Sequence, residues 1–124
     1  MKAKCFEDLV VWQKMHALVL AIYTITRSFP EDERFGLTAQ IRRSATSVAA
    51  NIAEGFGKES DRDKCRYYNI AQSSLDETRY FLILTMDLGF SDTRELLSSA
   101  NEIGRMLRAY RNTILDKDRS SSKY

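Results

Sequence analysis

The chain has 124 residues, of which 44% are hydrophobic and 29% charged, and its formal net charge is +2. This composition excludes a disordered chain, and the length suffices for one domain whose core needs no metal or disulfide. Five glycines and one proline are too few for the many turns of an all-β fold. We therefore expect a single all-α domain. A net charge this close to zero does not by itself indicate a nucleic-acid partner.

The first helix is predicted to begin at Glu7 or Asp8 and to run to Ser28. Its apolar side follows the helical spacing of three and four residues. The residues of this side are Leu9, Trp12, Met15, His16, Val19, Ile22, Tyr23 and Ile25. Pro30 cannot continue a helix, so residues 29–36 are expected to form a polar loop.

The second helix is predicted to run from Leu37 to Glu54, with Gly55 as a left-handed stop. Its core stripe is Leu37, Ile41, Ala45, Val48 and Ile52. The third helix is predicted to begin after Ser60, which forms a capping box with Asp63, and to reach Leu88. Its stripe is Tyr67, Tyr68, Ala71, Leu75, Thr78, Phe81, Leu82, Thr85 and Leu88. Gly89 should end it.

The fourth helix is predicted to begin near Asp92 and Glu95, which again resemble a capping box. Its apolar residues alternate steps of four and three, as coiled-coil-like packing requires. They are Leu96, Ala100, Ile103, Leu107, Tyr110 and Ile114. Four long helices with short connections predict an antiparallel up-down four-helix bundle over residues 1–116. Residues 117–124 are predicted to be a flexible tail.

A line of polar side chains follows the second predicted helix beside its apolar stripe. Its members are Gln40, Ser44, Ser47, Asn51 and Glu54. At about 100° per residue they share one face, where an ordinary solvated surface would more often carry Lys and Glu. Small hydroxyl and amide side chains permit close approach of another backbone, so we predict a helix–helix or subunit contact along this line. The alternative is a surface that simply tolerates small residues.

The sequence offers little for catalysis or for a bound metal. His16 is the one histidine, which excludes the Glu-x-x-His pairs of a di-iron bundle. We expect this side chain to be an ordinary core residue on the apolar side of its helix. The GFG sequence at 55–57 lacks the Lys-Ser/Thr that a phosphate loop requires. We therefore expect no enzyme, no metal, no cofactor and no small-molecule substrate.

The cysteines and the apolar runs indicate where the chain resides. Cys5 and Cys65 lie far apart without a CxxC motif, which is typical of free thiols in a reducing compartment. Glu7 and Asp8 interrupt the apolar run that a signal peptide would need. The longest strictly apolar run, Ala17–Tyr23, is too short to span a membrane. We therefore expect a cytoplasmic protein with no membrane partner.

Three groups of basic side chains are candidates for contacts with the phosphates of a nucleic acid. They are Arg42 and Arg43 on the second helix, Arg62, Lys64 and Arg66 at the start of the third, and Arg105, Arg108 and Arg111 on the fourth. The members of the last group are spaced by threes, so they are neighbours along one side of a helix. The alternative is that the same side chains pair with acidic residues of neighbouring helices.

Several long segments resemble the 23S rRNA intervening-sequence protein family, over residues 6–115. They are FEDLVVWQKM at 6–15, FPEDERFGLTA at 29–39, QIRRSATSVAANIAEGFGKES at 40–60, IAQSSLDET at 70–78, LGF at 88–90 and EIGRML at 102–107. The resemblance implies a bacterial four-helix-bundle protein that is similar to barrel-shaped homopentamers, so it implies a ring-like homo-oligomer. Many relatives carry Pro where this chain has Ala49, so we expect a straighter second helix here.

Two functions follow as expectations. The fold of the family is similar to that of the accessory variability protein of diversity-generating retroelements, which binds nucleic acid. The first expectation is accordingly a non-catalytic oligomer that binds RNA or another nucleic acid, or a nucleic-acid-handling protein, through its basic patches, and its RNA binding should weaken steeply with salt. The alternative is an oligomeric protein-interaction or scaffold module without affinity for nucleic acid.

Overall fold

The computed structural model describes the backbone of residues 2–122 and the side chains of residues 2–117. Within this range the chain forms four α-helices and no β-strand. The helices are α1 (Val10–Thr26), α2 (Leu37–Phe56), α3 (Asp61–Asp87) and α4 (Arg94–Ser122). Two 3-10 helices, η1 (Phe6–Asp8) and η2 (Glu31–Glu33), precede α1 and α2. None of the described helices is long and apolar enough to cross a membrane.

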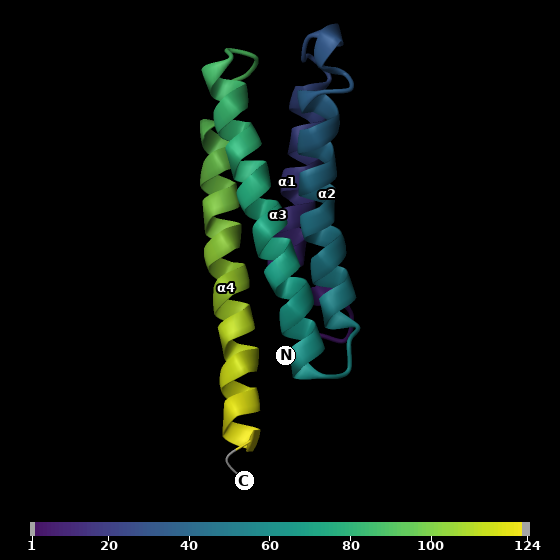
Figure 1. The fold of residues 1–124 in the computed structure, drawn as a ribbon, viewed down its shortest axis with the longest axis vertical. Coiled ribbons are helices and arrows are strands. Elements are labelled where there is room, and N and C mark those ends of the chain that lie inside the picture. The colour runs from purple at the N-terminus through teal and green to yellow at the C-terminus, as the bar shows by residue number, and fades with distance from the viewer. Residues whose placement is uncertain (1, 123–124) are drawn as a thin grey trace.

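The four helices pack side by side (Figure 1). α1 and α3 each contact both α2 and α4, whereas no close backbone approach joins α1 to α3 or α2 to α4 within residues 2–122. The core between them is filled by fully buried side chains, among them Met15 and Ile22 of α1, Ile41 and Ile52 of α2, Tyr68 and Leu75 of α3, and Ile103 and Leu107 of α4. Each helix therefore contributes one apolar side to a shared core, whose burial drives folding.

The predicted core stripes of α2 and α4 are confirmed. Every residue of the α2 stripe, from Leu37 to Ile52, is buried. The central residues of the α4 stripe are also buried, and Leu96, Tyr110 and Ile114 pack against the core while partly exposed. The stripe predicted for α3 is interrupted only at its end, where Leu88 is exposed because α3 stops at Asp87.

The beginning of α1 differs from the prediction. The first predicted turn is the 3-10 helix η1, Leu9 is extended with φ −73° and ψ 123°, and α1 begins only at Val10. The Asp8 carboxylate accepts hydrogen bonds from the backbone N–H groups of Lys4 (3.0 Å) and Cys5 (3.4 Å). An Asp side chain that bonds to nearby backbone competes with helix formation, which accounts for the later start.

The prediction that His16 faces the core is wrong. This side chain is exposed, and its ring stacks on Trp12 with centroids 5.1 Å apart and an interplanar angle of 6°. The buried side of α1 keeps the predicted Met15, Val19 and Ile22 and also includes Val11 and Leu18. Apolar residues cover most of the circumference of α1, so their spacing alone did not fix which side would be buried.

Two glycines have different roles. Gly55 was predicted to stop α2, but α2 continues through this buried residue to Phe56. A Cβ at Gly55 would lie 2.6 Å from Cε1 of Tyr68, so glycine here permits the close approach of α3. Gly89 has φ 75° and ends α3 as predicted, with the left-handed conformation that favours glycine.

The ends of the last two helices show how local sequence sets their bounds. The Ser60 side chain caps α3 by accepting a hydrogen bond from the Asp63 N–H (3.1 Å), as predicted. α4 continues to Ser122, past the predicted end at residue 116, because residues 117–122 contain no Gly or Pro that would stop it. The flexibility of residues 117–124 stays a prediction, and residues 123 and 124 lie outside the described range.

Candidate nucleic-acid interface

A polar groove runs between α3 and α4, and we call it the α3–α4 groove. It contains a hollow of about 230 Å³ lined by Gln72, Asp76, Arg79, Ala100, Asn101, Gly104, Arg105 and Arg108. On α3 its polar residues follow steps of four and three, beside the buried stripe of the same helix. The groove is therefore a direct consequence of helical periodicity, because each polar row lies next to a row of core residues.

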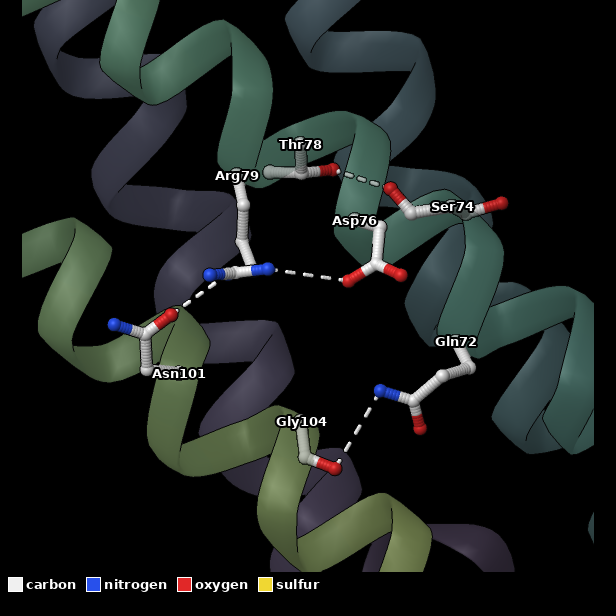
Figure 2. Close-up of polar contacts among 7 residues, drawn as sticks. All are labelled: Gln72, Ser74, Asp76, Thr78, Arg79, Asn101 and Gly104. Carbon is white, nitrogen blue, oxygen red and sulfur yellow. Dashed lines mark hydrogen bonds and ion pairs between the residues drawn. The ribbon is translucent and has the colours of Figure 1, made fainter.

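Hydrogen bonds connect the two helices across the groove (Figure 2). The Nε of Arg79 donates to Oδ1 of Asn101 at 2.7 Å, and its Nη1 lies 3.3 Å from Oδ1 of Asp76. Further along, Nε2 of Gln72 donates to the backbone oxygen of Gly104 at 3.5 Å. The contacts with Asn101 and Asp76 fix the Arg79 guanidinium at the groove, where its planar fork is suited to a phosphate or carboxylate.

The charge of the lining is predominantly positive. The hollow is lined by three guanidinium groups, of Arg79, Arg105 and Arg108, against the one carboxylate of Asp76. Arg105 and Arg108 are exposed, and neither forms an ion pair within 4.0 Å with a described residue. Glu102, the acidic neighbour of Arg105 on α4, instead contacts Lys14 of α1 at 2.6 Å. Lys14 first, and Arg105 to a smaller extent, hold the pKa of Glu102 below its ordinary value.

The third predicted arginine of α4 extends this basic row toward the other end of α3. Nη1 of Arg111 donates to Oδ1 of Asn69 at 2.5 Å. Its Nε is buried and has no hydrogen-bond partner among the described residues. The structure thus brings Arg105 and Arg108 together in the hollow and leaves Arg111 beside it, bonded to α3.

The other predicted basic groups are not brought to this groove. Arg42 lies against α1, where its Nε donates to Oγ1 of Thr26 at 2.9 Å and its guanidinium stands over the Tyr23 ring at 4.5 Å. Arg43 is exposed on α2, and α2 makes no close backbone approach to α4. Arg42 is therefore held by packing within the chain, and Arg43 is a separate surface charge.

The basic cluster at the start of α3 is divided among different roles. Nζ of Lys64 donates to the backbone oxygen of Phe56 at 2.6 Å and lies 3.4 Å from that of Gly55. It therefore satisfies carbonyl groups at the end of α2, as a cation at a helix C-terminus does. The Arg66 guanidinium stands 5.1 Å from the centroid of the Tyr67 ring, and Arg62 is exposed.

The polar line of α2 faces α3 in its central part. Oγ of Ser44 lies 2.8 Å from Oγ1 of Thr78, and Oγ of Ser47 lies 3.0 Å from Oγ of Ser74. Asn51 donates from its Nδ2 to the backbone oxygen of Ser47 at 2.8 Å. We call this set of hydroxyl contacts the α2–α3 seam.

The two ends of the polar line lie outside this seam. Gln40 is exposed. Glu54 is also exposed and forms an ion pair with Lys58 at 3.7 Å, one turn along the chain. Ser47 already packs within the chain, so a bulky residue there would disturb the fold as well as any subunit contact.

The sequence analysis did not identify Gln72 and Arg79 of α3 or Asn101 of α4 as part of the groove. Each lies one position from a core residue of its own helix. Polar residues that flank a core stripe on two helices that pack together were the signal that could have found them. Within residues 2–117, no group of three or more His, Cys, Asp or Glu side chains is placed to hold a metal ion.

These features define an all-α protein of four packed helices with a basic, amide-lined groove. The family model described as 23S rRNA-intervening sequence protein matches residues 7–109. The chain belongs to this family, which confirms the resemblance found in the sequence.

One solved structure shares this fold over most of the chain. It is a protein of unknown function from the S23 ribosomal protein family of Bacteroides thetaiotaomicron VPI-5482, and it is 27% identical to this chain. Its TM-score is 0.76, over 82% of this chain and 98% of that chain. No curated protein matches the chain.

Proposed function

We propose that the chain is the subunit of a non-catalytic, ring-like homo-oligomer that binds RNA or another nucleic acid through the α3–α4 groove. The observation that carries the proposal is the pair Arg105 and Arg108, which line the hollow together with Arg79 and have no ion-pair partner among the described residues. Guanidinium groups without a carboxylate partner are available for phosphate oxygens, and binding to them releases counterions from the nucleic acid.

Oligomerisation would allow the small basic patch of each subunit to contribute to nucleic-acid binding. One copy presents only a few guanidinium groups, and its net charge is +2. Several copies in one assembly would contact one strand at several points, so weak contacts would combine into useful avidity. A homopentamer is the assembly that the family resemblance implies.

The proposed subunit is an antiparallel up-down bundle. Contacts between α2 and α3 support this arrangement, since Ser44 meets Thr78 whereas Ser47 meets the earlier Ser74. Numbering that rises along one helix while it falls along its neighbour is typical of antiparallel packing. Cys5 and Cys65 are not joined in a disulfide, which fits a reducing compartment, so we propose that the assembly acts in the cytoplasm.

The test is binding of a fluorescent single-stranded RNA of mixed sequence, followed by anisotropy at low salt. The double variant Arg105→Gln/Arg108→Gln should bind about tenfold or more weakly than the wild type, if each lost phosphate contact contributes of order 1 kcal/mol. The matched control is Arg43→Gln, which removes an exposed arginine on a helix that does not line the groove. Equal loss in the control, or no loss in the double variant, would count against the groove.

A protein-interaction or scaffold role is the second candidate, and exposed apolar side chains favour it. Leu20 and Val10 on α1 are about half exposed, as are Tyr80 and Ile70 on α3. Aromatic side chains such as Tyr80 are enriched in contacts between subunits or with another protein. Absence of RNA binding together with a stable oligomer, measured by light scattering after gel filtration, would favour this candidate.

A further inference from the structure

The hollow of the α3–α4 groove offers hydrogen-bond acceptors as well as donors. Oε1 of Gln72 and Oδ2 of Asp76 are acceptors that bond to no described residue. Nδ2 of Asn101 is a donor in the same situation, because Asn101 contacts Arg79 through its Oδ1. Figure 2 shows these three atoms turned away from the hydrogen bonds that the same side chains form. The lining therefore has unused hydrogen-bonding capacity of both kinds.

A phosphate group would use only part of this set. Its oxygens accept hydrogen bonds, so they are matched by the guanidinium groups of Arg79, Arg105 and Arg108. Phosphate oxygens cannot satisfy the free acceptors of Gln72 and Asp76, and the Asp76 carboxylate repels them. The edge of a nucleobase carries donors and acceptors side by side, so it can bond to groups of both kinds. The mixed lining therefore favours contact with a base in addition to phosphates.

The position of the hollow between two helices limits which bases can reach it. Its lining includes the buried Ala100 and Gly104, and the amides of Gln72 and Asn101 are only partly exposed. In a duplex the Watson–Crick edges are paired, and the major groove of A-form RNA is too deep and narrow for side chains to read. The bases of a single strand can instead be turned out of the chain. An unpaired base is therefore the part of a nucleic acid that suits the hollow.

We propose that the α3–α4 groove is selective for single-stranded nucleic acid and that its hollow holds the edge of one unpaired base. Gln72 and Asp76 accept hydrogen bonds from N–H groups of this base, and Asn101 donates one to it. Arg105 and Arg108 contact the phosphates next to it. The inference rests on the proposed function and narrows its ligand, because a duplex has no unpaired base to place in the hollow.

Fluorescence anisotropy of the full chain with one labelled RNA strand, alone and paired in a duplex, tests the selectivity. A groove that contacts only phosphates should bind the duplex at least as tightly as the single strand, since the duplex has the higher charge density. A bond to a base edge adds affinity that only the single strand can gain. We therefore expect the single strand to bind about tenfold or more tightly than the duplex at the same low salt concentration.

The variant Gln72→Ala tests the base contact itself. It removes a neutral acceptor from the hollow and leaves every charge in place. Single-strand binding should weaken by about fivefold or more, as loss of one hydrogen bond implies, whereas duplex binding and the salt dependence should stay unchanged. Gln40→Ala is the matched control, because it removes an exposed glutamine of α2 that does not line the groove. Far-UV circular dichroism of each variant confirms that the helices are intact.

The outcomes separate this inference from the proposed function. It is overturned if the duplex binds as tightly as the single strand, if Gln72→Ala binds the single strand like the wild type, or if Gln40→Ala loses as much affinity. In each of these cases the proposed function still stands, provided that Arg105→Gln/Arg108→Gln weakens the binding. A wild-type chain that binds neither form of the RNA would overturn both.

Discussion

α3 packs against α2 on one side and α4 on the other, and the two contacts are chemically different. Toward α2 it presents hydroxyl groups and the Tyr68 ring, and Gly55 permits close approach. Toward α4 it presents Gln72, Asp76 and Arg79, which border a hollow. One helix thus supplies both a closely packed contact and an open polar one.

The difference separates residues that stabilise the fold from residues that are available to a ligand. In the α2–α3 seam the polar groups are small and satisfy one another, so their burial adds little penalty. In the α3–α4 groove the long charged side chains remain exposed, and ion pairs at such exposure contribute little to stability. Stability should therefore be sensitive to the seam, and binding to the groove.

The largest expected effect on stability is at Gly55. Gly55→Ala places a Cβ 2.6 Å from Cε1 of the fully buried Tyr68. We expect a loss of about 1–3 kcal/mol in the free energy of unfolding, as overpacking typically costs. Urea unfolding followed by circular dichroism measures it. Gly57→Ala is the control, because its Cβ would have ordinary contacts, and an equal loss there would show that the close approach to Tyr68 is not responsible.

A smaller loss is expected when a hydroxyl is removed from the seam. Thr78→Val keeps the shape of the side chain but deletes the bond to Ser44, so stability should fall by about 1 kcal/mol. Thr85→Val is a matched control in the same helix. Thr85 is also fully buried, but among the described residues its Oγ1 bonds only to the Phe81 backbone oxygen, within α3. Similar unfolding midpoints for the two variants would contradict a role for the contact between helices.

Charge removal in the groove should hardly affect stability. Arg105→Gln/Arg108→Gln is expected to change the free energy of unfolding by less than about 0.5 kcal/mol, since both side chains are exposed and form no ion pair with a described residue. Thermal unfolding in the absence of nucleic acid is the measurement. A large destabilisation would mean that the groove is structural, and would remove the contrast with the seam.

The smallest effect concerns the turn before α4. Hydrogen bonds from the Arg94 side chain, and then from its backbone, lower the pKa of Asp92 to about 2 from the ordinary 3.8. The folded pKa lies below the unfolded one, so this contribution is complete above pH 3.8 and is lost as the pH falls through about 2. NMR titration of the Asp92 carboxyl should show this pKa, and Arg94→Gln should raise it. An unchanged pKa in the variant would exclude Arg94 as the cause.

Much of the fold was predictable from the sequence because helical spacing and end signals agree. The stripe from Leu37 to Ile52 and the stop at Gly89 follow from periodicity and backbone chemistry alone. The prediction that Gly55 ends α2 was wrong, because the role of this glycine depends on Tyr68 of another helix. Residue spacing along one helix does not reveal such a contact. His16 was misplaced because α1 is apolar around most of its circumference.

The candidate site was predictable only in part. Arg105, Arg108 and Arg111 could be grouped by their spacing along one helix. Arg79 and Asn101 belong to the same groove through a contact between α3 and α4, and the pairing of helices is a property of the folded chain. Arg42 and Lys64 looked similar to the groove arginines in sequence, yet packing against Tyr23 and bonding to the end of α2 give them structural roles.

The salt dependence of RNA binding tests the central claim most directly. The logarithm of the binding constant should fall linearly with the logarithm of the salt concentration. Each phosphate contacted on a single strand contributes about 0.7 to the magnitude of this slope. If the groove binds phosphates, Arg105→Gln/Arg108→Gln should reduce that slope by about 1.4 per subunit engaged, two contacts at about 0.7 each, whereas Arg43→Gln should leave it unchanged. A slope that is the same in all three proteins would contradict the account.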